Sequence, residues 1–277
     1  MNTKIYKIAL TLFILALPFV IPYFNISENE ALLTAIALLF AILIGFFIAT
    51  ATSNYLRLQT LIADANACLI SIRNLVKRID PLKKKDIENA IDEYMIATLD
   101  YEFLDFVAKT RTEFKTIINV ADETTPSSDI GYALISELHS RMDDLLTNDQ
   151  EIALTSKPIV TNNHWFIIGI LTTLLTTALL SFRDESFFMS LFIGVMLLSI
   201  YHILVLIYHV DNNIFLGTKL SFESPQQVFM GIDRHHYYPE YAIKNGYAKP
   251  SSNIYRLGIY KNYPTSFEKE VVLVEPK

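Results

Sequence analysis

The stretch ALLTAIALLFAILIGFFIATATS, residues Ala31–Ser53, decides the fold class because it carries no charge at any position. Crossing the hydrocarbon core of a bilayer takes roughly 20 helical residues, with a lower limit near 17. Three further uncharged stretches accompany it, namely Ile8–Phe24, His164–Phe182 and Phe187–Tyr208. A single run of this kind is compatible with a buried core helix, but four runs in two close pairs predict four transmembrane helices.

The first apolar stretch also has features of a signal peptide, since Lys4 and Lys7 precede it. However, it lacks an A-x-A-like cleavage site, and a second apolar run follows almost at once. We therefore expect a retained helix that bends at Pro18 and Pro22, because neighbouring membrane helices satisfy the carbonyls that a proline frees.

The overall composition excludes several classes of protein. The 277 residues are 52% hydrophobic and 19% charged, whereas a typical soluble domain has about 25% charged residues. The formal net charge of -6 leaves no basic excess for phosphate contacts, so no nucleic-acid partner is expected. The single cysteine, Cys68, excludes an intrachain disulfide and a thiolate zinc site.

The distribution of Lys and Arg predicts the orientation in the membrane. The N-terminus, the segment Asn54–Asn163 and the tail from His209 hold 22 of the 23 basic residues, and only Arg183 lies in a hairpin. Both termini and the middle segment are therefore expected in the cytoplasm, with the chain in a bacterial inner membrane. The predicted class is an all-α membrane protein with four transmembrane helices and a cytoplasmic helical domain between helices two and three.

Four parts of the chain follow from this topology. They are a first transmembrane hairpin (1–53), a cytoplasmic helical domain (54–163), a second hairpin (164–208) and a cytoplasmic Tyr/Pro-rich tail (209–277). The helical domain holds 12 basic and 18 acidic residues, so it accounts for the whole net negative charge. In the tail, Val271–Val274 is expected to form a short strand within otherwise irregular structure.

Helical periodicity continues beyond the second apolar stretch and predicts one helix from Ala31 to Ile79. Asp80-Pro81 then marks a new start, because Asp caps helices and Pro suits a first turn. A helix is expected from Pro81 to about Ala108, and another from near Ser128 to a point before Pro158. The apolar side of the latter consists of Ile130, Leu134, Leu138, Met142 and Leu145.

Two stripes run along the second apolar stretch, each with a member at every fourth position. The small stripe is Ala37, Ala41, Gly45 and Ala49, and the bulky stripe is Leu38, Ile42 and Phe46. Small residues let helices approach closely in lipid, and rings of apolar side chains form dewetting constrictions in channels. We interpret the small stripe as a helix-packing surface and the bulky stripe as a pore neck. Periodicity leaves packing or lipid contact open as the alternative for both stripes.

No motif for catalysis or metal binding is present. The sequence lacks a Gly-rich phosphate loop, a G-x-S-x-G elbow and an H-E-x-x-H helix. The adjacent His235 and His236 face different directions on a regular element, which makes a poor metal site. His202 lies inside an apolar stretch, where an ionisable residue is a functional candidate. No enzyme activity, metal or cofactor is expected, because the apolar stretches contain no carboxylate.

Short motifs in a fixed order resemble the bestrophin pattern. Gly45-Phe46 resembles its pore-helix step, Asn54-Tyr55-Leu56-Arg57 its N-x-Y-x-R-like stretch, and Ser71-Ile72-Arg73-Asn74-Leu75 its S-R-N-L-like stretch. The bestrophin-like domain family of bacterial four-helix membrane proteins is similar over roughly Ile8 to Met230. The positions that carry this resemblance are Asp64, Arg73, Tyr94, Arg141, Pro158, Trp165, Asp211, Phe215 and Gly217.

The resemblance implies a function. Bestrophins are pentameric anion channels whose second helices surround the pore, so it implies self-association in lipid, with Leu38, Ile42 and Phe46 as the neck. Asn54 and Arg57 would then lie at the pore entry. The acidic character of the middle segment does not favour anions. The alternative function is a non-conducting membrane-anchored scaffold or signalling protein.

The sequence departs from the animal bestrophins at two places. Thr218-Lys219-Leu220-Ser221 stands where those proteins carry an acidic calcium-binding run, so no calcium site is implied. Leu58-Gln59-Thr60 replaces an aromatic-rich stretch.

Overall fold

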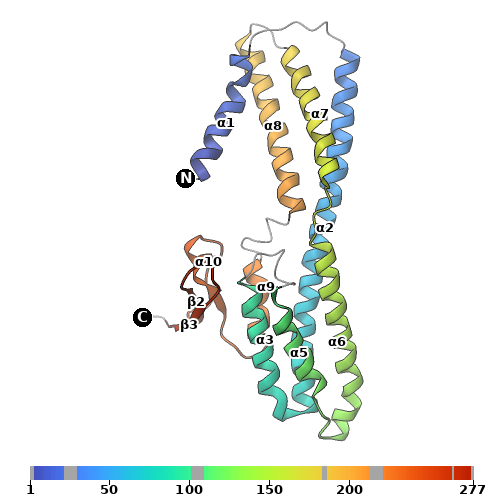
Figure 1. The fold of residues 1–277 in the computed structure, drawn as a ribbon, viewed down its shortest axis with the longest axis vertical. Coiled ribbons are helices and arrows are strands. Elements are labelled where there is room, and N and C mark those ends of the chain that lie inside the picture. Colours follow the sequence, from blue (N-terminus) through green and yellow to red (C-terminus); the bar gives the residue numbers. More distant parts are fainter. Residues whose placement is uncertain are drawn as a thin grey trace. The chain divides into compact units, whose positions relative to one another are not determined.

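The computed structural model describes residues 3–21, 30–100, 109–182, 186–212, 221–263 and 265–275 (Figure 1). The chain divides into two compact units. We call Met1–Ser53 with Pro158–Asn212 the membrane unit, and Asn54–Lys157 with Asn213–Lys277 the helix–sheet unit. One helix, α2 (Glu30–Ile79), contributes residues to both units.

The membrane unit contains α1 (Thr3–Val20), the first part of α2, α7 (Asn162–Ser181) and α8 (Phe187–Asp211). Among the described residues, α2, α7 and α8 are long and apolar enough to cross a membrane. The helices expected from the second, third and fourth apolar stretches are therefore confirmed. The apolar part of α1, Ile8–Val20, is shorter, so a fourth crossing stays a prediction. Pro18 lies inside α1, and Pro22 lies outside the described residues.

Close packing joins the helices of the membrane unit. Phe40, Ile44 and Phe47 of α2 share a buried cluster with side chains of α7 and α8. In lipid such contacts stabilise mainly through van der Waals packing. A Cβ atom on Gly194 of α8 would lie 2.9 Å from the backbone oxygen of Leu15 in α1, so only glycine allows this approach.

The helix–sheet unit has its own hydrophobic core. Its helices are the second part of α2, the 3-10 turn η1 (Pro81–Lys83), α3 (Lys84–Thr98), α5 (Arg111–Asp122), α6 (Asp129–Thr155) and α9 (Ser221–Gly231). Fully buried aliphatic side chains hold them together, each worth about 1.5–3 kcal/mol of hydrophobic burial. These include Leu69, Ile72, Val76, Ile91, Ile117 and Leu138.

The expected break at Asp80-Pro81 is confirmed. The Asp80 carboxylate accepts a hydrogen bond from the backbone N–H of Leu82 at 3.1 Å, and Pro81 opens η1. The helix predicted to run to Ala108 is wrong in its extent, because α3 ends at Thr98. Residues 101–108 lie outside the described residues, and α5 begins at Arg111. No Gly or Pro directly follows Thr98 to signal the end of α3.

The predicted start of α6 near Ser128 is confirmed. The Ser128 hydroxyl caps the helix by accepting from the N–H of Gly131 at 3.2 Å. Leu138, Met142 and Leu145 are buried as expected. Ile130 is 69% exposed, so its assignment to the apolar side was wrong: in this first turn the neighbouring Gly131 is the buried residue, close to Ile79 and Pro126.

The C-terminal part forms a sheet, so the all-α prediction needs correction. Three strands, β1 (Tyr237–Pro239), β2 (Tyr255–Tyr260) and β3 (Lys269–Val274), lie in the order β1-β2-β3. β1 pairs with β2 in parallel and β2 with β3 antiparallel, while the short helix α10 (Glu240–Lys244) follows β1. The expected strand at Val271–Val274 is confirmed as part of β3.

Side-chain hydrogen bonds anchor this sheet. The Gln226 amide of α9 donates to the carbonyl of Tyr237 at 2.9 Å and accepts from the Tyr237 N–H at 3.0 Å, which satisfies both backbone groups of that residue. Arg256 of β2 makes a bidentate pair with Asp92 of α3, with both distances at 2.7 Å. The Asn-rich, Tyr-rich tail is thereby ordered by contacts with α3 and α9 that are remote in sequence.

Candidate functional site

The bulky stripe of α2 has no cover within the described chain. Leu38, Ile42 and Phe46 are 59%, 62% and 63% exposed. At about 100° per residue these three side chains span an arc of roughly 80° around the helix. Large apolar side chains therefore stand mostly exposed along one edge of α2, where the Phe46 ring packs edge-on against that of the adjacent Phe47, with centroids 5.7 Å apart.

The small stripe adjoins the bulky one on the same open side. Ala41, Gly45 and Ala49 are exposed, and only Ala37 packs against the core of the membrane unit. A Cβ atom built on Gly45 would meet no heavy atom within 4 Å. Within the described parts of the chain Ala37 packs as the sequence predicts, and for Ala41, Gly45 and Ala49 the helix-packing role stays a prediction.

The opposite face of α2 is used by the chain itself. Phe40, Ile44 and Phe47 are only 6%, 5% and 3% exposed, packed against α7 and α8. Both faces are apolar, so sequence hydropathy does not separate them. Burial separates them into a face that holds the membrane unit together and a face we call the free face, defined by Leu38, Ala41, Ile42, Gly45, Phe46 and Ala49.

The two predicted pore-entry residues contact α6. The side-chain amide of Asn54 donates to the backbone oxygen of Thr155 at 2.7 Å, which satisfies one of the last carbonyls of that helix. Arg57 forms an ion pair with Glu151 at 2.7 Å, and its side chain is 63% exposed. Both residues therefore help to hold α6 against α2 within the helix–sheet unit.

Arg73, one of the resemblance positions, is the centre of a buried ionic cluster. Its guanidinium donates from Nε to Glu88 of α3 at 2.8 Å and also contacts Asp233, which follows α9. Arg73 is 5% exposed and joins three segments, with Glu88 buried beside it and the Asp233 side chain 69% exposed. Its hydrogen bond and charge hold the pKa of the Asp233 carboxyl below the usual range.

Three other resemblance positions meet at one corner of the membrane unit. The Asp211 carboxylate at the end of α8 is 3% exposed and accepts from the backbone N–H groups of Ile159 at 2.8 Å and Val160 at 3.2 Å. Pro158 begins the segment that these bonds fix ahead of α7. Trp165 packs edge-on against Tyr208, with ring centroids 6.3 Å apart. This corner ties the start of α7 to the end of α8.

The remaining predicted positions are distributed over the fold. Tyr94 is buried and packs edge-on against Phe114, with centroids 5.7 Å apart, and burial raises the pKa of its hydroxyl. Asp64 and Arg141 line one cavity between α2 and α6. Phe215 and Gly217 lie outside the described residues.

The histidines noted in the sequence have local partners. His202 is exposed, and its Nδ1 lies 2.9 Å from the carbonyl of Leu198, one turn earlier in the same helix. His236 contacts the hydroxyl of Ser251 at 3.2 Å. Within the described ranges, no group of three or more His, Cys, Asp or Glu side chains is placed to hold a metal ion.

These features define a helical integral membrane protein whose second helix keeps an open apolar face. The family model of the Bestrophin-like domain matches residues 28–218. The chain belongs to the bestrophin-like domain family. The match extends from the start of α2 to beyond the end of α8, so it includes the free face and the Asp211 corner.

Solved structures share the fold at low sequence identity. An alanine variant of a membrane protein is 13% identical, with a TM-score of 0.58, covering 83% of this chain and 99% of its own. A bacterial bestrophin homologue from Klebsiella pneumoniae with a leucine-to-threonine mutation is 12% identical, with a TM-score of 0.55, covering 82% of this chain and 97% of its own. No curated protein matches the chain. The similarity establishes a bestrophin-type fold.

Proposed function

We propose that the chain is one subunit of a homo-oligomeric ion channel whose pore is lined by the free face of α2. The single observation that carries this proposal is the open bulky stripe, with Leu38, Ile42 and Phe46 each about three-fifths exposed beside a buried opposite face. Membership of the bestrophin-like family supports it, because bestrophins are channels built from several copies. The proposal assigns no catalytic activity to the chain.

The geometry of the free face suits a ring of identical helices. The small and bulky stripes are neighbours, since Gly45 and Ile42 are separated by roughly 60° around the helix. In a ring, the small stripe would contact the neighbouring copy of α2, while the bulky stripe would point toward the axis. Close approach at Ala41 and Gly45 would then bring the bulky side chains near one another, which makes a narrow apolar neck. By resemblance the ring is a pentamer.

We further propose that the permeant ion is an anion. The amide of Asn54 has two N–H donors, one of which goes to Thr155, and such amide donors solvate anions without fixed positive charge. Arg57 supplies a cation whose side chain is 63% exposed, although Glu151 offsets its charge. The acidic surplus of 54–163 acts in the opposite direction, so the sign of the permeant charge is measured directly in the test.

The proposed setting is a bacterial inner membrane with both termini in the cytoplasm. The asymmetry of Lys and Arg supports this orientation, because basic residues are retained on the cytoplasmic side. The helix–sheet unit would then be cytoplasmic.

The test combines assembly and conduction. Native mass spectrometry of the detergent-purified chain gives the number of copies, and liposome flux with a chloride gradient gives conduction and the sign of the reversal potential. We expect an oligomer that passes chloride, and a Leu38/Ile42/Phe46→Ala variant that keeps its copy number while its flux changes by about tenfold or more, because side-chain truncation widens an apolar constriction.

Matched substitution of three exposed apolar residues elsewhere in the membrane unit is the control. Phe166, Phe188 and Phe192 are 71%, 79% and 61% exposed, and their replacement by Ala should leave flux unchanged. A monomer, or an oligomer without flux in every form, would contradict the channel and favour the scaffold. A reversal potential that follows the cation gradient would contradict anion selectivity alone.

A further inference from the structure

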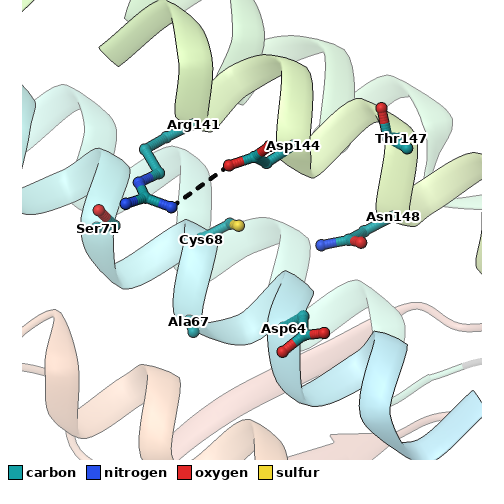
Figure 2. Close-up of a pocket in the computed structure, with 8 residues that line it drawn as sticks. All are labelled: Asp64, Ala67, Cys68, Ser71, Arg141, Asp144, Thr147 and Asn148. Carbon is teal, nitrogen blue, oxygen red and sulfur yellow. Dashed lines mark hydrogen bonds and ion pairs between the residues drawn. The ribbon is translucent and has the colours of Figure 1, made fainter. Parts of the chain in front are cut away.

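The helix–sheet unit contains a cavity of about 550 Å³ between α2 and α6 (Figure 2). This volume lies within the range of about 300–1,000 Å³ that is common for small-molecule sites. Side chains of both helices line it, and most are polar. They are Asp64, Ala67, Cys68 and Ser71 of α2 with Arg141, Asp144, Thr147 and Asn148 of α6.

Arg141 supplies a hydrogen-bond donor without an acceptor. Its Nη1 lies 3.3 Å from Asp144 Oδ2 and its Nη2 lies 3.9 Å from Glu137 Oε1, whereas its buried Nε has no hydrogen-bond partner in the part of the chain that the structure describes. Figure 2 shows the guanidinium reaching from α6 toward Ser71 of α2. A buried donor left without an acceptor is costly, so this corner of the cavity favours an acceptor such as a carboxylate.

The rest of the cavity favours a positive group. Asp64 and Asp144 supply two carboxylates against the one guanidinium of Arg141, so the lining has a net negative formal charge. Burial, reinforced by the negative charge of Asp144, raises the pKa of the Cys68 thiol. Cys68 therefore lines the cavity as a protonated, uncharged thiol at physiological pH and adds no further negative charge.

We propose that this cavity binds a small zwitterion of the amino-acid class. The carboxylate of the ligand accepts from Arg141, and its ammonium group donates to Asp64, which does not share the Arg141–Asp144 contact. Asn148 and Thr147 supply neutral donors and acceptors on the α6 side. Neither an anion alone nor a cation alone satisfies both charged ends of the cavity.

Three of the side chains that line the cavity also appear among the motif positions of the sequence. Asp64, Ser71 and Arg141 all belong to the motifs by which the chain resembles its family, and the structure gathers them around one cavity. None of them contributes to the free face of α2. The proposed ligand site is therefore independent of the proposed pore, and either proposal can fail without the other.

Cys68 gives a direct measure of occupancy, because it is the only cysteine of the chain and lines the cavity. The purified full-length protein is labelled with a fluorescent maleimide, with and without L-alanine or L-glutamine at about 10 mM, enough to saturate millimolar affinity. We expect at least one amino acid to slow labelling about fivefold or more. Acetate and ethylammonium, which carry one charged group each, should protect much less at the same concentration.

Two variants and one control locate the ligand groups. Arg141→Met and Asp64→Asn should each weaken protection about tenfold, the loss expected for one charge-assisted hydrogen bond. Asp143→Asn changes an exposed carboxylate that does not line the cavity and should keep full protection. Thermal unfolding confirms that each variant is folded.

Three results would overturn the proposal. They are the absence of protection by either amino acid, equal protection by ethylammonium alone, and protection that persists in Arg141→Met. If a variant does not fold, the comparison of whole amino acids with acetate and ethylammonium on the unmodified chain decides the matter.

Discussion

The two halves of α2 follow one helical periodicity but differ in how the chain covers them. In the amphipathic half, Asn54–Ile79, most apolar side chains are covered by the chain itself, although Leu56 is 55% exposed. Those with at most 1% exposure are Leu58, Leu69, Ile72, Val76 and Ile79. In the apolar half, Glu30–Ser53, Leu38, Ile42 and Phe46 keep about three-fifths of their surface exposed. The chain therefore completes the core of one unit and leaves a face of the other open.

The surroundings explain this difference. In water, each Å² of apolar surface removed from solvent contributes about 25 cal/mol, so the amphipathic half gains by burying its apolar side completely. In lipid that driving force is absent, and a helix is held by close packing and hydrogen bonds. An open apolar face costs little there, and it can be reserved for a contact with another copy.

The largest expected effect is a loss of stability on substitution of Arg73, in the amphipathic half of α2. Arg73→Met removes the main partner of Glu88, whose side chain is 11% exposed, and leaves it only the ion pair with Lys84 at 3.6 Å among the described residues. We therefore expect a loss of about 3 kcal/mol in the free energy of unfolding, the low end for breaking a buried pair. Denaturant or thermal unfolding of the purified protein measures it. Arg57→Met removes the exposed pair with Glu151 and should cost about 0–1 kcal/mol. Equal losses in the two variants would show that burial of the Arg73 cluster is not what matters.

The next largest effect concerns the membrane unit, where the Asp211 side chain is a buried charged group, only 3% exposed. Asp211→Ala leaves the N–H groups of Ile159 and Val160 without an acceptor, and we expect a loss of about 1–3 kcal/mol. Asn212→Ala is the neighbouring control, since its side-chain amide donates to the carbonyl of Tyr208 in its own helix. Thermal unfolding in detergent compares them, and an unchanged Asp211→Ala variant would argue against a role of this corner in stability.

A substitution at Gly45 tests whether the open face serves assembly. Gly45→Leu finds free space within the chain, so its helix content should stay unchanged by circular dichroism. In the oligomer it overpacks the contact, and we expect subunit affinity to fall by about 1–3 kcal/mol. Gly169→Leu is matched, because a Cβ there also meets no atom within 4 Å. Native mass spectrometry should show dissociation for Gly45→Leu only, and equal behaviour would place the contact elsewhere.

The smallest effect is a dependence on pH at Asp233. Its pKa lies below the ordinary 3.8, so the Arg73–Asp233 pair stabilises the fold above that value. Between the ordinary pKa and the lowered one, the unfolded chain binds the proton more readily than the folded chain. The stabilising contribution is therefore lost as the pH falls through this range. Asp233→Asn should thus lower the melting temperature slightly near pH 7 and not at all at strongly acid pH. A difference that persists undiminished in acid would contradict the pairing.

Much of the helical architecture could be predicted because hydropathy and capping are local signals. The uncharged stretches predicted α2, α7 and α8, and Asp80-Pro81 predicted the end of α2 within one residue. The separation of α3 from α5 and the order of the sheet could not be predicted. The first has no Gly or Pro to announce it, and the sheet depends on contacts such as Gln226 with Tyr237 that join distant segments.

The candidate site was predictable as a pattern but not as a surface. Fourfold spacing identified Leu38, Ile42 and Phe46, yet Phe40, Ile44 and Phe47 beside them are equally apolar. Only the packing of α7 and α8 shows which set is covered. The convergence of Asp64 and Arg141 on one cavity was also beyond the sequence, since it depends on how α2 and α6 pair.

Cysteine cross-linking within the membrane tests the central claim most directly. In a Cys68→Ser background, Ile42→Cys and Phe192→Cys place single thiols on side chains of equal exposure, 62% and 61%, on α2 and α8. A bis-maleimide of short reach is then added to membranes that contain each variant. We predict covalent oligomers for Ile42→Cys and monomers for Phe192→Cys. Cross-linking of Phe192→Cys alone, or of neither, would contradict an assembly around the free face of α2.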